Sequence, residues 1–278
     1  MLGVKAAGDY RLRLRGLEFH VRIAGSGAPL IWGHGLMGAV DSEQRLGWFG
    51  WEQVPPGIQL VRYDARGHGA SEASHTAESY AWTNLAGDML ALADAMAADT
   101  FIAGGASMGC ATALTAALAA PQRVRALVLV FVPNVWEARA AQARSYRISA
   151  LEGRVLGGAG LARWMARTMP ERLPPWLLAA QPEVIAILKS GIGRLKARTL
   201  WHLLRGAALS NLPPREAFAT LAAIPATILT WTGDPAHPLA MAEEVHRLLP
   251  RSELFVARNH ADFQSFPQRI ATFASSIA

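Results

Sequence analysis

The sequence contains very little cysteine and very little lysine. Cys110 is its one cysteine, so no disulfide can form within the chain and thiolate clusters for metals are excluded. Lysine occurs only at positions 5, 189 and 196, and the net charge of +6 comes mostly from arginine. No aromatic-interleaved basic stripe accompanies that charge, so we expect no nucleic-acid partner. No spacing of histidine and acidic residues suggests a metal site, and we expect no cofactor.

Long apolar runs are also missing. No segment approaches the roughly 18 uninterrupted apolar residues that a membrane-spanning helix requires, and residues 1–9 lack the apolar stretch of a signal peptide. We therefore expect a cytoplasmic protein without a membrane span. With 278 residues, of which 51% are hydrophobic, the chain can build one large domain or one domain with an insertion.

The pattern along the chain predicts strands and helices in alternation. Residues 10–15 and 17–23 alternate apolar and polar side chains and predict two half-buried strands joined as a hairpin at Gly16. Short apolar runs predict buried strands over 29–32, 58–63, 101–104, 126–132, 226–231 and 253–256, and helical spacing predicts helices over 78–98, 109–120, 239–249 and 263–277. This alternation is typical of an α/β fold with a parallel sheet covered by helices on both faces.

The alternation stops between residues 134 and 224. This segment contains no convincing strand, and its helical pieces are interrupted at glycine and proline positions such as Gly157 and Pro170. A helical insertion at this point of an α/β order predicts a lid over the active edge of the sheet. We therefore expect a core domain formed by residues 1–133 and 225–278 and a helical cap formed by residues 134–224.

The cap carries most of the positive charge. Residues 134–215 contain 13 lysine and arginine residues against 4 aspartate and glutamate residues, a net charge of +9. This asymmetry either steers an anionic substrate toward the cleft or belongs to a solvated surface. The sequence leaves both interpretations open.

The pattern Gly105-x-Ser107-x-Gly109 stands between a short apolar strand and an alanine-rich helix. A serine at such a turn is raised out of the sheet, and the N-terminus of the following helix supplies free N–H groups. Small residues on both sides let neighbouring backbone pass close to a strained corner. The pattern therefore predicts a nucleophilic serine at position 107.

A serine nucleophile requires a base and a group that orients the base. His260 follows the last strand and is our candidate for the base, and Asp234 follows the preceding strand and is our candidate for the acid. Because parallel strands end at one edge of the sheet, both should lie on the same side as Ser107. Asp262, two residues from His260, should point elsewhere, and the strand ending at Val132 is followed by no carboxylate.

Five motifs together resemble the α/β-hydrolase fold family over nearly the whole chain. They are His34-Gly35, Asp64-Ala-Arg-Gly-His-Gly-Ala-Ser71, Gly105-Ala-Ser-Met-Gly109, Gly233-Asp234-Pro and Asn259-His260. The resemblance is to a serine esterase-like member with a helical cap, and it implies a mostly parallel eight-stranded sheet flanked by helices. It also implies that Ser107 attacks an acyl carbon, His260 moves the proton and Asp234 holds the imidazole. By the same resemblance, the backbone N–H groups of Leu36 and Met108 form the oxyanion hole.

Residues near these motifs and in the cap are candidates for the substrate pocket. They are His34, Met37, Trp136, Trp164, Trp176, Trp201 and His237. The tryptophans either wall an apolar acyl pocket or pack the cap onto the core. We expect His34 and His68 to have structural roles in turns, and His237 either lines the pocket or belongs to a turn before Pro238.

The resemblance implies a carboxylic ester hydrolase that acts through an acyl-enzyme on esters with small to medium apolar groups. An enol-lactone hydrolase, a thioesterase and a carbon–carbon bond hydrolase remain open on the same residues, as does a ligand receptor with vestigial hydrolysis. Ser107 argues against haloalkane dehalogenase and epoxide hydrolase activity, because those relatives carry aspartate at the elbow. We expect a small-molecule ester or lactone as the partner, and monomer and dimer both stay open.

Overall fold

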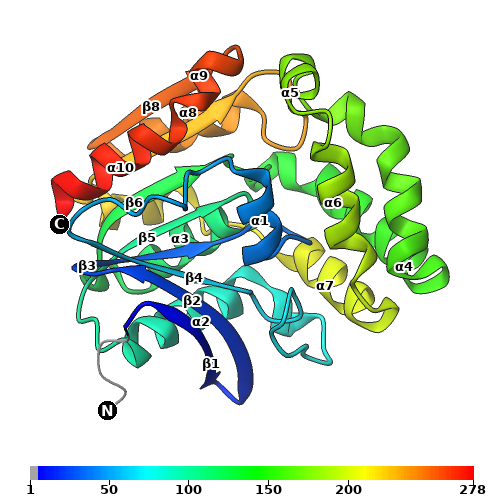
Figure 1. Ribbon diagram of the computed structural model, residues 1–278, viewed down its shortest axis with the longest axis horizontal. Coiled ribbons are helices and arrows are strands. Elements are labelled where there is room, and N and C mark those ends of the chain that lie inside the picture. Colours follow the sequence, from blue (N-terminus) through cyan, green and yellow to red (C-terminus); the bar gives the residue numbers. More distant parts are fainter. Residues whose placement is uncertain (1–5) are drawn as a thin grey trace.

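An eight-stranded sheet runs through the computed structural model, which describes residues 6–278 (Figure 1). Residues 1–5, the start of the predicted core domain, lie outside the described part. The strands are β1 (Gly8–Leu14), β2 (Leu17–Gly25), β3 (Ala28–Gly33), β4 (Ile58–Tyr63), β5 (Phe101–Ala106), β6 (Val124–Val130), β7 (Ala226–Trp231) and β8 (Ser252–Ala257). Their order is β1-β2-β4-β3-β5-β6-β7-β8, and of these strands β2 runs antiparallel to both neighbours while the pairs from β4 to β8 are parallel. The predicted α/β class with a mostly parallel sheet is confirmed.

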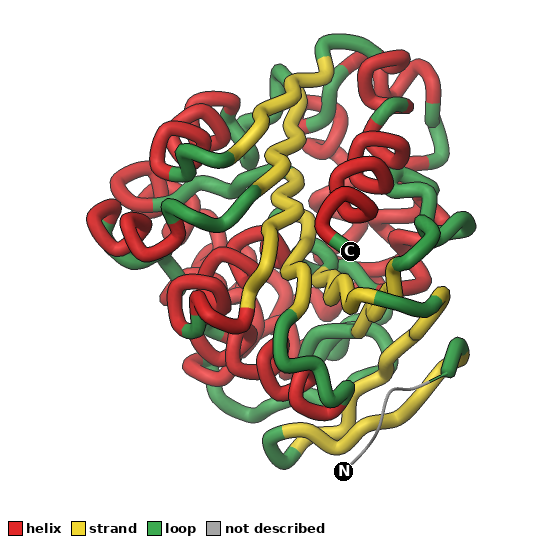
Figure 2. The backbone as a smooth tube through the Cα atoms, turned by 90° about the vertical axis from the view of Figure 1, so that its left-hand side faces the viewer, coloured by secondary structure: helices red, strands yellow, loops and turns green. Residues whose placement is uncertain are grey.

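Helices lie on both sides of the strands (Figure 2). The core helices are α1 (Val40–Leu46), α2 (Trp82–Ala95), α3 (Met108–Ala119), α8 (Leu239–Leu248), α9 (His260–Gln264) and α10 (Phe266–Ile277), with short 3₁₀ turns η1 (Glu78–Tyr80) and η2 (Pro121–Arg123). Helices α2, α3 and α8 share one buried cluster with Leu127 of β6, whereas α10 shares another with Val128. Successive residues of β6 thus face opposite layers, which is why a central parallel strand reads as a continuous apolar run.

The chain between β6 and β7 forms helices and no strand. Its elements are η3 (Trp136–Ala138), α4 (Arg139–Thr168), η4 (Met169–Arg172), α5 (Pro175–Ala180), α6 (Val184–Gly193), α7 (Ala197–Leu209) and η5 (Arg215–Leu221). Helix α4 is interrupted at Gly157, whose φ of 65° and ψ of 178° are not helical. The predicted absence of strands here is confirmed, and the division into core and cap domains stays a prediction. No helix within residues 6–278 combines the length and apolar character needed to cross a membrane.

Two helical regions depart from the sequence prediction. Helix α1 is not predicted, because seven residues carry too little periodicity to indicate a helix; it begins where the Ala39 N–H donates to the Ser42 hydroxyl at 2.8 Å. The single helix expected over 263–277 is instead α9 followed by α10. Pro267 lies in the first turn of α10, where the missing N–H of proline is tolerated.

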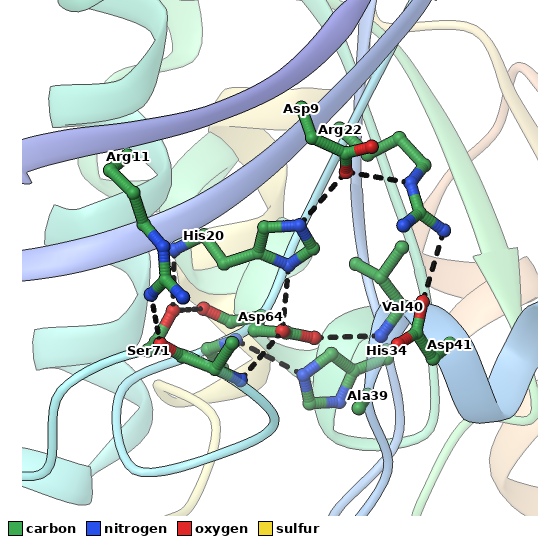
Figure 3. A network of polar contacts seen from close by, with 12 residues as sticks. Asp9, Arg11, His20, Arg22, His34, Ala39, Val40, Asp41, Asp64 and Ser71 are labelled. Atoms are coloured by element: carbon green, nitrogen blue, oxygen red, sulfur yellow. Dashed lines mark hydrogen bonds and ion pairs between the residues drawn. The ribbon is translucent and has the colours of Figure 1, made fainter.

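Asp64, directly after β4, joins the loops after β3 and β4 to strand β2 (Figure 3). Its buried carboxylate accepts hydrogen bonds from the Val40 N–H at 2.7 Å and from the Ala70 N–H at 2.9 Å. The Nδ1 atom of His20 on β2 lies 2.8 Å from the same carboxylate, and its Nε2 atom lies 2.9 Å from Asp9. Asp64 therefore fixes the start of α1 and the loop after β4 against the hairpin strands.

His34 and His68 extend this support to the loop after β3. The Ala65 N–H donates to His34 Nε2 at 3.0 Å, so the protonated Nδ1 of His34 donates to the Gly35 carbonyl at 2.8 Å. The Met37 N–H donates to His68 Nε2 at 3.1 Å. Burial lowers the pKa of both imidazoles, that of His68 to about 3, so both are neutral near pH 7. Their predicted structural roles are confirmed.

The Asp64–His20 contact makes the stability of the fold depend on pH in both the acidic and the near-neutral range. Burial alone would raise the pKa of Asp64, but the hydrogen bond from His20, the neighbouring His34 imidazole and two backbone N–H groups lower it from 3.8 to about 2. The hydrogen bond to Asp64 raises the pKa of His20 above 6.5 despite partial burial. A carboxylate with a lowered pKa stabilises the fold above its unfolded pKa, whereas an imidazole with a raised pKa does so below its unfolded pKa.

We therefore expect Asp64→Asn to lose less stability at pH 2 than at pH 6. The difference in free energy of unfolding between wild type and Asp64→Asn should shrink as pH falls from about 4 to 2, where wild type also protonates this carboxylate.

For His20→Gln we expect the opposite pH dependence. The difference in free energy of unfolding between wild type and His20→Gln should be largest below about pH 6.5 and shrink as pH rises through the raised pKa of His20. Urea denaturation at a series of pH values measures both, and differences independent of pH would contradict this account.

Candidate active site

Ser107 occupies a strained turn between β5 and α3. Its φ of 55° and ψ of −108° are rare for a residue with a side chain, and its N–H donates to the Val130 carbonyl at 2.9 Å. A Cβ atom added at Gly109 would lie 1.9 Å from the Gly33 carbonyl oxygen, and one added at Gly105 would lie 2.4 Å from the Gly109 carbonyl carbon. Neither position therefore accepts a side chain, as the sequence pattern predicts.

His237 contacts both Ser107 and Asp234. Its Nε2 atom lies 2.8 Å from Ser107 Oγ, and its Nδ1 atom lies 2.7 Å from Asp234 Oδ2. An ionised carboxylate only accepts hydrogen bonds, so His237 Nδ1 carries the proton and donates it to Asp234. His237 Nε2 is then the acceptor for the Ser107 hydroxyl. The three side chains form one hydrogen-bonded series in which the serine proton faces a free imidazole lone pair.

Asp234 is held in its ionised state by Trp231, the last residue of β7, and by two residues of its own loop. Burial alone would raise the pKa of Asp234, but the hydrogen bond and charge of His237, the indole N–H of Trp231 at 2.9 Å and the Ala236 N–H at 2.8 Å lower it overall. The carboxylate is 6% exposed. Its fixed charge therefore points at the imidazole with little screening by water.

The structure does not bring His260 to Ser107, and this part of the sequence prediction is corrected. His260 is the first residue of α9 and half-buried; within residues 6–278 its ring makes no hydrogen bond, and it is absent from the cavity beside Ser107. Asp262 accepts the Arg258 N–H at 2.9 Å and its own N–H is capped by Asn259, so it points away from Ser107 as expected.

Loop length and strand order explain why His237 takes the position. Strand β8 lies three strands from β5, about 14 Å at normal strand spacing, whereas β7 lies two strands away. Two residues separate β8 from α9, while residues 232–238 form a longer loop after β7. Phe263 further holds α9 in place, with its ring 5.3 Å from that of Trp231. The signal available in the sequence was the Asp234-x-x-His237 spacing directly after a strand.

The two predicted oxyanion donors are the backbone N–H groups of Met108, which follows Ser107 in the chain, and of Leu36 in the loop after β3. Met108 is the first residue of α3, where an N–H has no acceptor within the helix. A Cβ atom added at Gly35 would lie 3.7 Å from Ser107 Cβ, so the loop after β3 passes close to the nucleophile. In that loop the Met37 N–H is bonded to His68, whereas the Leu36 N–H has no acceptor among the described residues. Both predicted donors thus lack an acceptor among the described residues, and their part in an oxyanion hole stays a prediction.

Ser107, Asp234 and His237 face a cavity of about 250 Å³ between the core and the inserted helices. Aromatic rings of the core form much of its wall, namely Trp48, Phe49, Phe131 and Trp231. The inserted helices contribute Met165, Met169, Leu188 and Ile192. Of the predicted pocket residues, Met37 and His237 line this cavity. Phe131 and Trp231 were missed, although each stands at the carboxyl end of a strand beside β5 or β6.

The other predicted pocket residues lie elsewhere. His34 is buried in the support of the loop after β3, and Trp136 packs on Phe218 while its indole N–H donates to the Pro213 carbonyl at 2.9 Å. Trp164 is 37% exposed, and Trp176 packs against Trp231 and Phe263 behind the wall. Trp201 stacks with Arg154 and Arg205. Of the two interpretations of the cap tryptophans, lining the pocket is therefore wrong, because these side chains pack against other residues or are exposed.

One buried carboxyl group belongs to the cavity wall. Glu43 of α1 is 7% exposed, and its Oε2 atom accepts the indole N–H of Trp32 at 2.9 Å. Burial raises the pKa of Glu43 to about 8, against the smaller opposing effects of Trp32 and Arg62. Glu43 is therefore mostly neutral at pH 7. Within residues 6–278 no cluster of histidine, cysteine and acidic side chains could hold a metal ion.

Solved structures share this fold over almost their full lengths. The enol-lactonase from Burkholderia xenovorans LB400 is 20% identical, with a TM-score of 0.72 over 96% of this chain and 98% of that one. A thermophilic esterase from Thermogutta terrifontis is 19% identical, with a TM-score of 0.77 over 97% of each chain. At such identities the likeness concerns the fold.

A curated sequence relative and a family pattern complete the comparison. An epoxide hydrolase of Caballeronia sordidicola is 28% identical over 138 residues, which are 48% of this chain and 39% of that protein. The chain thus matches well under half of that relative's length. The sequence pattern described as the alpha/beta hydrolase fold matches residues 28–266. Together with the sheet order and the serine turn, this match establishes that the chain belongs to the alpha/beta hydrolase fold family of hydrolases.

Proposed function

We propose that this protein is a serine hydrolase that cleaves carboxylic esters with small to medium apolar groups. The observation that carries the proposal is the series Ser107 Oγ, His237 and Asp234 Oδ2, joined at 2.8 and 2.7 Å and facing an apolar cavity. A serine with an imidazole acceptor and an oriented carboxylate is the arrangement that acyl transfer requires. We assign the base to His237.

The first half of the reaction forms an acyl-enzyme. Ser107 Oγ attacks the ester carbonyl carbon while its proton moves to His237 Nε2. The Asp234 carboxylate stabilises the resulting imidazolium and keeps its Nε2 directed at the serine. When the tetrahedral intermediate collapses, His237 returns the proton to the departing alkoxide, and the alcohol leaves.

The backbone N–H groups of Leu36 and Met108 receive the negative charge on the carbonyl oxygen. Each such donor contributes about 3 kcal/mol to the transition state. In the second half of the reaction, His237 takes a proton from water, the hydroxide attacks the acyl carbon, and Ser107 is released with its proton restored. The acyl group leaves as a carboxylic acid.

The cavity supports an uncharged, apolar group next to the reacting carbonyl. Its walls are mostly aromatic and aliphatic side chains. Of the ionisable side chains on the wall besides Asp234 and His237, the Glu43 carboxyl group is mostly neutral at pH 7, and Arg172 is an exposed residue. A lactone is an internal ester and passes through the same steps, so the likeness to an enol-lactonase keeps that substrate class as the second candidate. Epoxide hydrolysis fits poorly, because opening an epoxide with Ser107 would leave an ether that water does not cleave.

We expect Ser107→Ala and His237→Ala each to lower kcat/KM for p-nitrophenyl butyrate by roughly 10⁴-fold or more, because nucleophile and base act as a unit. His260→Ala is the matched control and should retain nearly full activity, since its ring contacts neither Ser107 nor Asp234. Steady-state hydrolysis and circular dichroism of the three variants measure activity and folding.

The reverse result would assign the base to His260 instead of His237. If His260→Ala lost activity as Ser107→Ala does while His237→Ala kept it, the assignment of His237 would be wrong. Intact-mass spectrometry after a fluorophosphonate probe gives a second readout, because the label should appear on wild type and be absent from Ser107→Ala. Labelling without turnover of any ester or lactone would instead favour the ligand-receptor interpretation.

Asp234→Asn should lower kcat by about 10⁴-fold with little change in KM, because an amide no longer holds the proton on His237 Nδ1. Asp262→Asn is the comparison, since that carboxylate only caps the start of α9. The same ester assay decides between them. Equal losses in the two variants would mean that the Asp234 carboxylate has no special part in the reaction.

Met165→Trp should shift the preferred acyl chain of p-nitrophenyl esters toward shorter lengths. Met165 lines the cavity, so a larger ring there fills space that a longer acyl chain would occupy. We expect roughly a tenfold loss of kcat/KM for the longest accepted ester. Arg163→Trp adds the same ring at an exposed position of α4 and should leave the chain-length profile unchanged.

A further inference from the structure

Large exposed hydrophobic side chains gather on one helix. Six stand out in residues 6–278, and five of them belong to α4: Ile148, Leu151, Val155, Leu156 and Trp164, which are 50, 57, 81, 50 and 37% exposed. The sixth, Leu209, is 57% exposed at the end of α7. Such a concentration of apolar surface marks a contact site more often than scattered single residues do.

Arginines alternate with these apolar residues on the same side of α4. Positions three, four and seven apart share a helix face, and this spacing relates three exposed arginines to three of the exposed apolar residues. Together they form the outer face of α4: Arg144, Arg147, Ile148, Leu151, Arg154 and Val155. The helix carries a single acidic residue, Glu152.

The opposite side of α4 is already used for packing. Its small residues Ala143, Ala150 and Gly153 are buried, and Gly153 lies against Leu200 of α7. Figure 1 places α4 at the outer edge of the molecule, with α6 on its inner side. Further along the same helix, Met165 belongs to the wall of the cavity that Ser107 faces. The outer face is therefore turned to solvent while its helix also borders the substrate cavity.

We propose that the outer face of α4 docks on the surface of anionic phospholipid. A helix that lies at a membrane interface buries apolar side chains while arginines reach the phosphate layer, and the outer face combines both. The positive charge of the outer face favours anionic phospholipid over a second copy of the chain as its binding partner. A two-fold contact through the same face would set its arginines against those of the partner. Binding at this face does not depend on the proposed ester hydrolysis.

The test is sedimentation of the wild-type protein with ether-linked vesicles, whose lipids contain no ester to cleave. One set contains equal parts of diether phosphatidylglycerol and diether phosphatidylcholine, and the other contains phosphatidylcholine alone. Wild type should bind the anionic set at least about tenfold more tightly. Val155→Asp should lose at least tenfold in that binding, and Arg144→Gln with Arg147→Gln should lose roughly fivefold for each arginine.

Leu209→Asp is the matched control, because it places the same charge at another exposed apolar residue, 57% exposed, outside the outer face. It should bind as wild type does, and all variants should keep the wild-type melting temperature and ester turnover. No binding to the anionic vesicles, equal binding to both sets, or equal losses in Val155→Asp and Leu209→Asp would overturn the proposal. A dimer in sedimentation velocity that Val155→Asp dissociates would overturn it in favour of a second copy.

Discussion

The contact between Gly33 at the end of β3 and Gly109 in the first turn of α3 is the constraint on which the site depends. The two backbones approach so closely that no side chain fits at position 109. This approach accompanies the unusual backbone conformation of Ser107 and brings the loop after β3 beside that serine. Hydrogen bonds add to this steric constraint, because buried Asp64 and the two neutral histidines, His34 and His68, hold that loop and its N–H groups in place.

Much of the fold could be predicted because local patterns carry it. The apolar runs of β4 and β7 match their strands residue for residue, and the hairpin turns at Gly16 as expected. The serine turn was equally readable, because glycines on both sides of Ser107 have one steric meaning in that context. Helix α1 could not be predicted from its seven residues, because its start is fixed by a hydrogen bond to Asp64, which lies far away in the sequence.

The partner of Ser107 could not be derived from strand order alone. Both His237 and His260 follow strands that end at the same edge, so position along the chain does not separate them. The path of each loop decides, and that path depends on packing such as the contact of Phe263 with Trp231. The prediction that the cap tryptophans line the pocket was wrong for a related reason. The sequence shows that aromatic rings are present, whereas the packing of the helices determines which rings face the cavity.

The proposed acid and base, Asp234 and His237, come from one short loop after β7 and lie three residues apart in the sequence. The geometry between them is therefore set locally, while the loop itself is held from outside by Asn134, which donates hydrogen bonds to the Pro235 and Ala236 carbonyls. Asp234 sets the imidazole tautomer within the loop, independently of the distance from His237 to Ser107. A substitution at Asn134 that shifted this loop would therefore change the distance from His237 to Ser107 while the Asp234–His237 contact stayed intact.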